Sequence, residues 1–315
     1  MTKYKIIFFG GDRLLENGPL SKLSLFLKKK KIKFLIITDH LHLKKKVNNN
    51  LIFKNILQKH NYEFICVKKL NFDLLKNYVN KKETIGFSIN SIWKFNEEII
   101  SLFKGRLYNY HAADLPTERG AGNITWRILM KKKKNISINI HEVAKEYDTG
   151  CILKSKKISI PRNKKLPFEH LQMIEKIEKS FLEKFLINCL NKKKFTKIKQ
   201  LNVNSLYWPR INSDIDGLIN WHWKADQIVD FIKGFSRPYN GAFTFLYRKK
   251  IRIFNAEKIK LKEKFHPFQN GIVFREHNKF IYIAAEKFAL KVSLSDIEGI
   301  DKTKYYFLGK RFLNE

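Results

Sequence analysis

The sequence has few cysteines, and none of them form a redox or metal-binding pair. Among its 315 residues there are three, Cys66, Cys151 and Cys189, which are widely spaced and include no C-x-x-C motif. An odd number of scattered cysteines argues against a disulfide framework. The pattern is typical of buried thiols in a reducing compartment.

Long apolar runs are also missing. No stretch approaches the roughly 20 apolar residues that span a bilayer, so we expect no membrane partner. A strand-like run begins at Tyr4, which leaves no room for a signal peptide with its charged, apolar and small-residue regions. The hydrophobic content of 44% supports a packed core. We therefore expect a soluble, cytoplasmic protein.

Acidic residues are scarce relative to basic ones. Asp and Glu number 29 against 63 Lys and Arg, which gives a formal net charge of +34. Such basicity is typical of proteins that bind nucleic acids or anionic membranes. However, only 11 of the basic residues are arginine, and lysine runs such as 28–31 and 131–134 are dispersed and not interleaved with aromatics. The charge favours a solvated lysine-rich surface, with attraction to a phosphate-bearing substrate as the alternative.

The first half of the chain alternates short apolar runs with helix-like stretches. This alternation predicts an α/β fold with a Rossmann-like, mostly parallel sheet and helices on both faces. Strands are expected at 5–9, 33–38, 63–67, 84–88, 106–110, 136–143 and 151–160. Helical periodicity predicts helices at 20–29, 51–59, 73–79, 96–103 and 167–190.

A change of character marks the second half. Residues 196–212 lack a clear period, contain Pro209, and are predicted to be a linker. One helix at 225–235 and several short strands follow, which predict a small C-terminal β-barrel. The expected organisation is a first domain over 1–195, the linker over 196–212, and the β-barrel domain over 213–315.

The first strand–helix junction contains a pair of glycines, Gly10 and Gly11. Paired glycines let backbone amides approach an anionic group, so Gly11 is a candidate for substrate binding. The dinucleotide-binding pattern G-x-G-x-x-G is absent, and a tight turn is the alternative. Asp39 follows the second predicted strand, where it would either bind a ribose or cap a helix.

The strongest chemical signal is Asn109-Tyr110-His111 at the end of a predicted strand. Because side chains alternate faces along a strand, Asn109 and His111 point the same way. Open α/β sheets bind ligands at the carboxyl ends of their strands. An amide can donate a hydrogen bond to a developing oxyanion, and an imidazole can take up the proton of an attacking amine. The pair therefore suits acyl transfer, although a buried, satisfied pair is an equally good reading.

A carboxylate downstream fits the same chemistry. Asp148, in the loop Glu146–Gly150 between two predicted strands, could approach His111, hold its tautomer and stabilise the imidazolium. The alternative is an aspartate that caps its own turn.

These motifs together resemble the folate-dependent formyltransferases, whose signature is N-x-H-x-S-x-L-P-x-x-R-G, then I-x-W, then D-x-G-x-I-L. The matching segments here are Asn109–His111, Leu115–Pro116, Arg119–Gly120, Ile124–Trp126 and Asp148–Leu153. The C-terminal half resembles the same family at Ile219–Trp221, Arg237–Phe243 and Phe307–Lys310. The resemblance covers nearly the whole chain and implies a C-terminal barrel of the oligonucleotide-binding type.

The resemblance implies that the catalytic residues are Asn109, His111 and Asp148. It also implies that the co-substrate is 10-formyltetrahydrofolate, bound near Ser88, Asn90, Ile92 and Tyr147. Ordinary core packing is the alternative for Ile92. Arg119 is a further candidate for binding the acceptor. No metal is expected, because His40-x-His42 has no cysteine or further histidine nearby.

Three functions fit these motifs. Arg237–Phe243 is closer to the enzymes that formylate nucleotide-linked aminosugars, which favours a nucleotide-sugar acceptor. The alternative acceptor is initiator tRNA, but the segment 39–44 lacks the long basic insertion of the tRNA enzyme. A non-catalytic nucleic-acid-binding protein is the third reading, and the intact catalytic set argues against it. The sequence leaves open whether the chain forms a homodimer.

Overall fold

The structure, a computed structural model, describes residues 4–10, 19–45, 51–131, 134–262, 264–304 and 306–313, the side chains of residues 19–22 and 25 excepted. The chain divides into two compact units. The first contains Met1–Gly120, Ile136–Ser159 and Met173–Tyr207, and the second contains Ala121–Asn135, Ile160–Gln172 and Trp208–Glu315. The division expected from sequence includes residues 121–135 and 160–172 in the first domain. In the structure these residues belong to the second unit.

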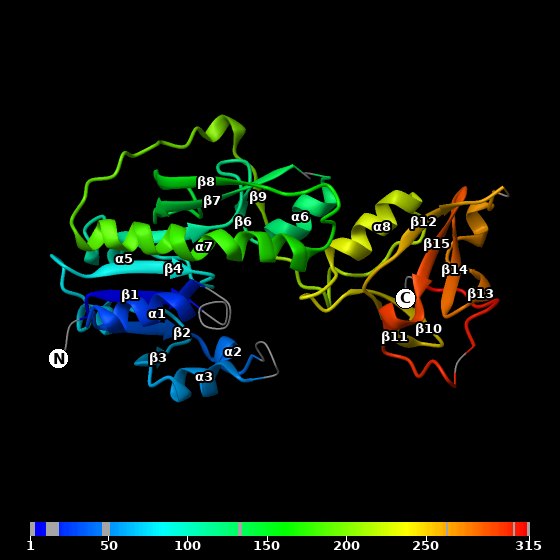
Figure 1. Ribbon diagram of the computed structural model, residues 1–315, viewed down its shortest axis with the longest axis horizontal. Helices are drawn as coiled ribbons and strands as arrows, with labels where there is room; N and C mark the ends of the chain where they lie inside the picture. Colours follow the sequence, from blue (N-terminus) through cyan, green and yellow to red (C-terminus); the bar gives the residue numbers. More distant parts are fainter. Residues whose placement is uncertain are drawn as a thin grey trace. The chain divides into compact units, whose positions relative to one another are not determined.

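The first unit is built on a seven-stranded sheet (Figure 1). Its strands are β1 (Ile6–Gly10), β2 (Phe34–Thr38), β3 (Phe64–Cys66), β4 (Ile85–Ile89), β5 (Leu107–His111), β7 (Asn135–Glu142) and β8 (Ile152–Ser159). Their order is β3-β2-β1-β4-β5-β7-β8. The first five are parallel, and β7 runs antiparallel to β5. The prediction of a mostly parallel sheet is confirmed.

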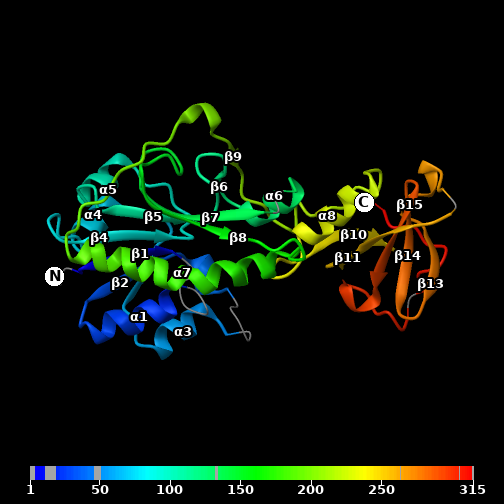
Figure 2. The ribbon, with the colours of Figure 1, turned by 45° about the horizontal axis from the view of Figure 1, so that its top comes forward.

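Helices cover both faces of this sheet. They are α1 (Pro19–Lys29), α2 (His40–Leu43), α3 (Phe53–Lys59), α4 (Phe72–Lys76), α5 (Glu97–Leu102) and α7 (Pro167–Leu190). Successive side chains of β1 point to opposite faces. Phe9 packs edge-on against Phe95, next to α5, with centroids 5.1 Å apart. On the other face Phe8 contacts Phe87, which packs on Phe185 of α7, and Figure 2 shows α7 running along the sheet. The predicted two-sided cover is confirmed.

The predicted linker, residues 196–212, carries regular structure. It contains a 3-10 turn at Asn202–Asn204 and the strand β9 (Tyr207–Trp208), which pairs with β6 (Arg119–Gly120). Ile198 forms a two-way backbone bridge with Ile152, the first residue of β8. This segment therefore pairs with the first residue of β8.

The second unit contains two helices, α6 (Asn123–Leu129) and α8 (Ala225–Gly234), and two antiparallel sheets. The three-stranded sheet consists of β10 (Ala242–Leu246), β11 (Lys249–Ile253) and β16 (Ile297–Glu298). The four-stranded sheet consists of β12 (Glu257–Lys260), β15 (Phe288–Ser293), β14 (Phe280–Ala285) and β13 (Val273–His277). Short 3-10 turns lie at Pro267–Gln269 and Leu294–Asp296. The structure confirms an antiparallel β region at the C-terminal end of the chain, and its closure into the predicted β-barrel stays a prediction.

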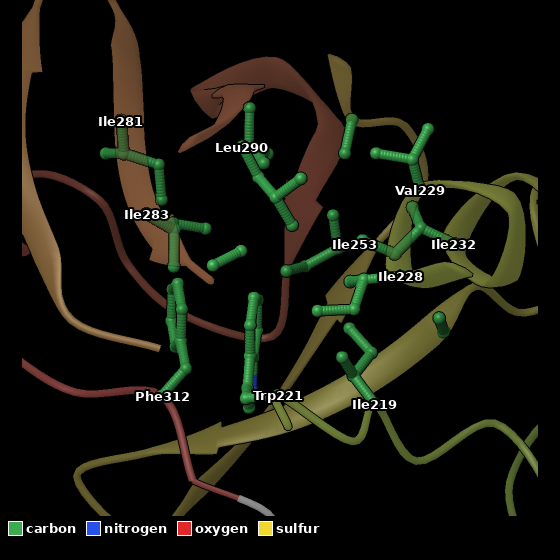
Figure 3. Close-up of a cluster of buried hydrophobic side chains, with 14 of the residues drawn as sticks. Ile219, Trp221, Ile228, Val229, Ile232, Ile253, Ile281, Ile283, Leu290 and Phe312 are labelled. Atoms are coloured by element: carbon green, nitrogen blue, oxygen red, sulfur yellow. The ribbon is translucent and has the colours of Figure 1, made fainter. Parts of the chain in front are cut away.

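One hydrophobic core joins α8 to both of these sheets (Figure 3). Ile228 and Ile232 are fully buried on one side of α8, as the 3.6-residue period of the sequence predicts. Trp221 stacks on Phe312 with centroids 5.5 Å apart, and its indole N–H donates to Thr244 Oγ1 at 3.0 Å. A buried indole needs such a partner, so this polar contact lets the core include the ring. In the described part of the chain, no helix is long and apolar enough to cross a membrane.

Candidate active site

The three residues predicted to be catalytic lie together in the first unit. Asn109 and His111 project from the carboxyl end of β5, and Asp148 lies in the loop between β7 and β8. The Asn109 side-chain amide donates to Asp148 Oδ1 at 3.1 Å, and His111 Nδ1 lies 3.6 Å from Asp148 Oδ2. The predicted convergence of these side chains is confirmed.

The Asp148 carboxylate is almost fully enclosed by partners. The backbone N–H of Gly120 donates to its Oδ2 at 2.8 Å, and His141 Nε2 lies 3.2 Å from its Oδ1. Burial alone would favour the neutral acid. The nearby His111 and His141 rings and the Gly120 amide outweigh that cost and hold the pKa of the carboxyl well below its usual range. Asp148 is therefore a carboxylate at neutral pH.

This depressed pKa predicts how stability changes in acid. A carboxyl whose pKa is lower in the folded than in the unfolded chain stabilises the fold above its unfolded pKa, and this stabilisation is lost as the pH falls toward the folded pKa. We expect the unfolding free energy of the wild type, relative to Asp148→Asn, to decrease below about pH 4. Urea unfolding of both proteins between about pH 3 and 6 measures this difference. A difference that does not change with pH would contradict the assignment.

A backbone carbonyl determines which ring nitrogen of neutral His111 carries the hydrogen. Its Nε2 lies 2.6 Å from the carbonyl oxygen of Glu118. A carbonyl can only accept, so Nε2 carries a hydrogen and Nδ1 is the nitrogen that can take up a proton. The Glu118 carbonyl, rather than Asp148, therefore holds the tautomer of His111. Asp148 lies where it can stabilise the imidazolium.

His141 is a member of this cluster that the sequence interpretation missed. It is the register partner of Asn109 across β5 and β7, and its Nε2 lies 3.1 Å from the Asn109 amide nitrogen. Its Nδ1 lies 2.7 Å from the carbonyl oxygen of Glu142. A signal was present, because Ser137, Asn139 and His141 alternate with isoleucines and place three polar side chains on one strand face.

Arg119, predicted to bind the acceptor, is held by side chains of this protein. It is 7% exposed, its Nε and Nη2 donate to Gln200 Oε1 at 3.2 and 3.1 Å, and Nη2 also donates to Asn202 Oδ1 at 3.1 Å. Burial lowers the pKa of its guanidinium, and the Asp148 charge opposes that shift. Its role in acceptor binding stays a prediction. Gly11, the other candidate, lies outside the described residues.

The four residues predicted to contact the folate lie on two segments. Ser88 is in β4 beside Asn109, and Asn90 follows that strand with a left-handed φ of 55°. Ile92 and Tyr147 are 37% and 44% exposed, and the Tyr147 ring packs near that of Tyr207 with centroids 6.2 Å apart. Their role in binding stays a prediction.

A cavity of about 480 Å³ adjoins the Asp148 loop within the first unit. The side chains of Ile100, Leu107 and Val143 give it apolar walls, and Thr149 and Gly150 bring the catalytic loop to its surface. This lining includes none of the four residues predicted to bind the folate. In the sequence, Leu107 and Val143 carry no signal beyond their places in the predicted strands 106–110 and 136–143.

The segment His40-x-His42 forms part of the short helix α2, which Asp39 caps. Asp39 caps α2 by accepting from the backbone N–H groups of Leu41 and His42, at 2.8 and 3.1 Å, and its carboxylate also contacts the His42 ring. The capping alternative therefore describes Asp39. Among the described residues, no group of three or more histidine, cysteine or acidic side chains could hold a metal ion.

Comparisons with known proteins agree with this arrangement. Residues 212–306 match the formyl transferase C-terminal domain. The bifunctional polymyxin resistance protein ArnA of Wigglesworthia glossinidia brevipalpis is 26% identical over 238 residues, which is 72% of this chain and 35% of that protein. The methionyl-tRNA formyltransferase of Thermotoga maritima is 28% identical over 211 residues, 65% of this chain and 64% of that protein. The C-terminal domain match and these relatives support a folate-dependent formyltransferase family for this chain. The matches span about a third and just under two thirds of these relatives' lengths.

A solved structure of a sugar formyltransferase shares the fold. This protein is WlaRD, a sugar 3N-formyl transferase whose crystal structure contains dTDP and 5-N-formyl-THF. The two chains superpose with a TM-score of 0.63 at 20% identity, over 92% of this chain and 97% of that one. At this identity the likeness supports the arrangement of strands and helices and leaves the acceptor open.

Proposed function

We propose that this protein transfers the formyl group of 10-formyltetrahydrofolate to the amino group of a nucleotide-linked aminosugar. The observation that carries this proposal is the juxtaposition of an amide donor, an imidazole with one nitrogen able to accept a proton, and a buried carboxylate at one strand end. Family membership supports the same chemistry.

The Asn109 amide would stabilise charge on the formyl oxygen. Its Nδ2 carries two hydrogens, of which Asp148 Oδ1 accepts one at 3.1 Å, and His141 Nε2 also lies 3.1 Å from Nδ2. One of them must turn to the substrate as negative charge develops on the formyl oxygen. A single such donor contributes about 10²–10³-fold in comparable sites. Asp148 keeps the Gly120 hydrogen bond when Asn109 turns away.

His111 would move the proton released by the attacking amine. A bond forms between the amine nitrogen and the formyl carbon, the bond from that carbon to the folate nitrogen breaks, and the amine loses one proton. Nδ1 of His111 can accept that proton because Nε2 is held by the Glu118 carbonyl. The imidazolium so formed faces the Asp148 carboxylate, which stabilises it. The same proton can then pass to the departing folate nitrogen.

The cavity beside the Asp148 loop suits the flat ring system of a folate. Ring systems of this kind bind in apolar clefts with a few polar groups that fix their orientation. Ile100, Leu107 and Val143 supply apolar walls, and its volume of about 480 Å³ lies in the usual range for such ligands. A folate bound there would lie beside the loop that carries Asp148. Because the lining lacks Ser88, Asn90, Ile92 and Tyr147, this cavity is an alternative to the folate site expected from the family resemblance.

The acceptor is the less constrained half of the proposal. The Arg237–Phe243 segment, which resembles the enzymes that formylate nucleotide-linked aminosugars, supports an aminosugar nucleotide. The sequence match to a methionyl-tRNA formyltransferase supports initiator tRNA as the second candidate. Binding of a tRNA requires ordered basic loops that contact its phosphate backbone. Such contacts make the affinity fall steeply as the salt concentration rises.

A formyl-transfer assay separates these acceptors. Purified protein and 10-formyltetrahydrofolate would be offered a panel of aminosugar nucleotides and, separately, charged initiator tRNA. We expect turnover of at least one aminosugar nucleotide and poor turnover of the tRNA. The proposed acceptor would be wrong if the protein formylated the tRNA efficiently, lost that activity steeply as the salt concentration rose, and formylated no aminosugar nucleotide.

A further inference from the structure

Gln200 connects the catalytic loop to a buried arginine. Its side-chain amide nitrogen donates to the backbone carbonyl oxygens of Asp148 and Gly150, both at 2.7 Å. Its side-chain oxygen accepts from Arg119 Nε and Nη2. The residue is 7% exposed and comes from the segment predicted to be a linker. One side chain therefore ties together three segments that are distant in sequence.

We propose that Gln200 is a positioning residue that fixes the Asp148 carboxylate against His111. The inference rests on the formyl-transfer function proposed above, because it assigns Gln200 a part in that reaction. It applies to a residue that neither the sequence motifs nor the expected catalytic set include.

The backbone of Asp148 explains why such a clamp is needed. Asp148 has a φ of 55°, in the left-handed region that a residue with a side chain adopts at a cost. A conformation of this kind persists only where its surroundings over-determine it. The two hydrogen bonds from Gln200 hold the carbonyls of residues 148 and 150, on either side of Thr149. They fix the direction in which the Asp148 side chain leaves the loop.

Arg119 anchors Gln200 and is adjacent in sequence to another partner of Asp148. Its backbone N–H bonds to the Leu206 carbonyl oxygen at 3.0 Å, and the next residue, Gly120, donates to Asp148 Oδ2. The guanidinium thus anchors Gln200 while the adjacent backbone bonds to the carboxylate. Loss of Gln200 would loosen the loop and leave both carbonyls without this donor.

Direct contact with substrate is the competing role, since Gln200 also lines the cavity. The hydrogen-bonding capacity of the side chain argues against it. A glutamine amide has two N–H donors and an oxygen with two lone pairs. The two carbonyls and the two Arg119 nitrogens occupy all four, so a ligand would have to displace one of them.

Two variants of Gln200 test this role. Gln200→Met keeps the length of the side chain and removes both donors. Gln200→Glu keeps an acceptor for Arg119 and sets a carboxylate oxygen against the two carbonyls, so it serves if Gln200→Met folds poorly. The matched control is Gln58→Met, at an exposed position of α3. We expect kcat to fall about 10-fold or more in both Gln200 variants and to stay unchanged in the control.

A double-mutant cycle with Asp148→Asn distinguishes positioning from general damage. If Gln200 acts through Asp148, then Gln200→Met lowers kcat in the wild type but changes it by less than about 2-fold in the Asp148→Asn background. Equal losses in both backgrounds would overturn the inference, because a residue that merely supports the fold or the cavity acts independently of Asp148.

A titration decides the question without any turnover. The carboxyl carbon of Asp148 can be followed by NMR in protein labelled at aspartate, with the signal assigned by its absence in Asp148→Asn. The carboxylate faces His111 of β5, His141 of β7, the Gly120 amide of β6 and the Arg119 charge. We expect its pKa to rise in Gln200→Met and to stay unchanged in Gln58→Met. An unchanged pKa in Gln200→Met overturns the inference, whereas a wild type that formylates no acceptor rejects the proposed function alone.

Discussion

Replacing Asp148 with asparagine is expected to lower the rate of formyl transfer by about 10²–10⁴-fold. The asparagine keeps the size of the side chain and an oxygen that can accept from the Gly120 amide. It removes the negative charge that faces His111 Nδ1 at 3.6 Å, so the imidazolium formed during the reaction is no longer stabilised. Single-turnover kinetics with saturating folate and acceptor measure this step directly.

The matched control is Asp73→Asn, an exposed aspartate in α4 whose charge change is the same. We expect this control to keep wild-type kinetics. Calorimetry measures the affinity of Asp148→Asn for the folate. We expect this affinity to change much less than the rate of formyl transfer, because Asp148 does not line the cavity. Near-wild-type turnover in Asp148→Asn would remove the carboxylate from the mechanism.

The fold was predictable because its signals are local. The helix predicted at 167–190 is observed with the same ends. The strand predicted at 106–110 lies one residue further along, at Leu107–His111. Short elements were harder, and β6, β9 and β16 were missed. Two-residue strands are too short to show a period, and only tertiary pairing defines them.

The candidate site was predictable where it coincides with a motif at a strand end. Asn109 and His111 share a face by the two-residue period of a strand, which a sequence reveals. Gln200 could not be found in this way. It lies in an aperiodic, lysine-rich segment, and its partners are 50 to 81 residues away in sequence. Only the packing of residues 198–207 on the Asp148 loop brings it there.

Gly150 shows why the catalytic loop has its particular sequence. A Cβ atom at this position would lie 1.8 Å from the carbonyl oxygen of Glu142 and 2.7 Å from its carbonyl carbon. Both are backbone atoms of the neighbouring strand β7, so no side chain can rotate to make room. The motif Asp148-Thr149-Gly150 thus combines the carboxylate with the one residue type that lets its loop approach β7.

Gly150→Ala is therefore expected to reduce formyl transfer by about 10²-fold or more, because a displacement of roughly 1 Å at a reacting group has this effect. The backbone of residues 148–150 must move away from Glu142, and the Asp148 carboxylate moves with it. Overpacking should also lower the unfolding free energy by about 1–3 kcal/mol.

Gly309→Ala is the matched control, because Gly309 has a φ of +76° but open space around its Cβ position. We expect Gly309→Ala to lower the unfolding free energy by a similar amount, about 1–2 kcal/mol, and to keep full formyl-transfer activity. Kinetics and urea unfolding of both variants make the comparison, and full activity in Gly150→Ala would show that the position of this loop does not control the reaction.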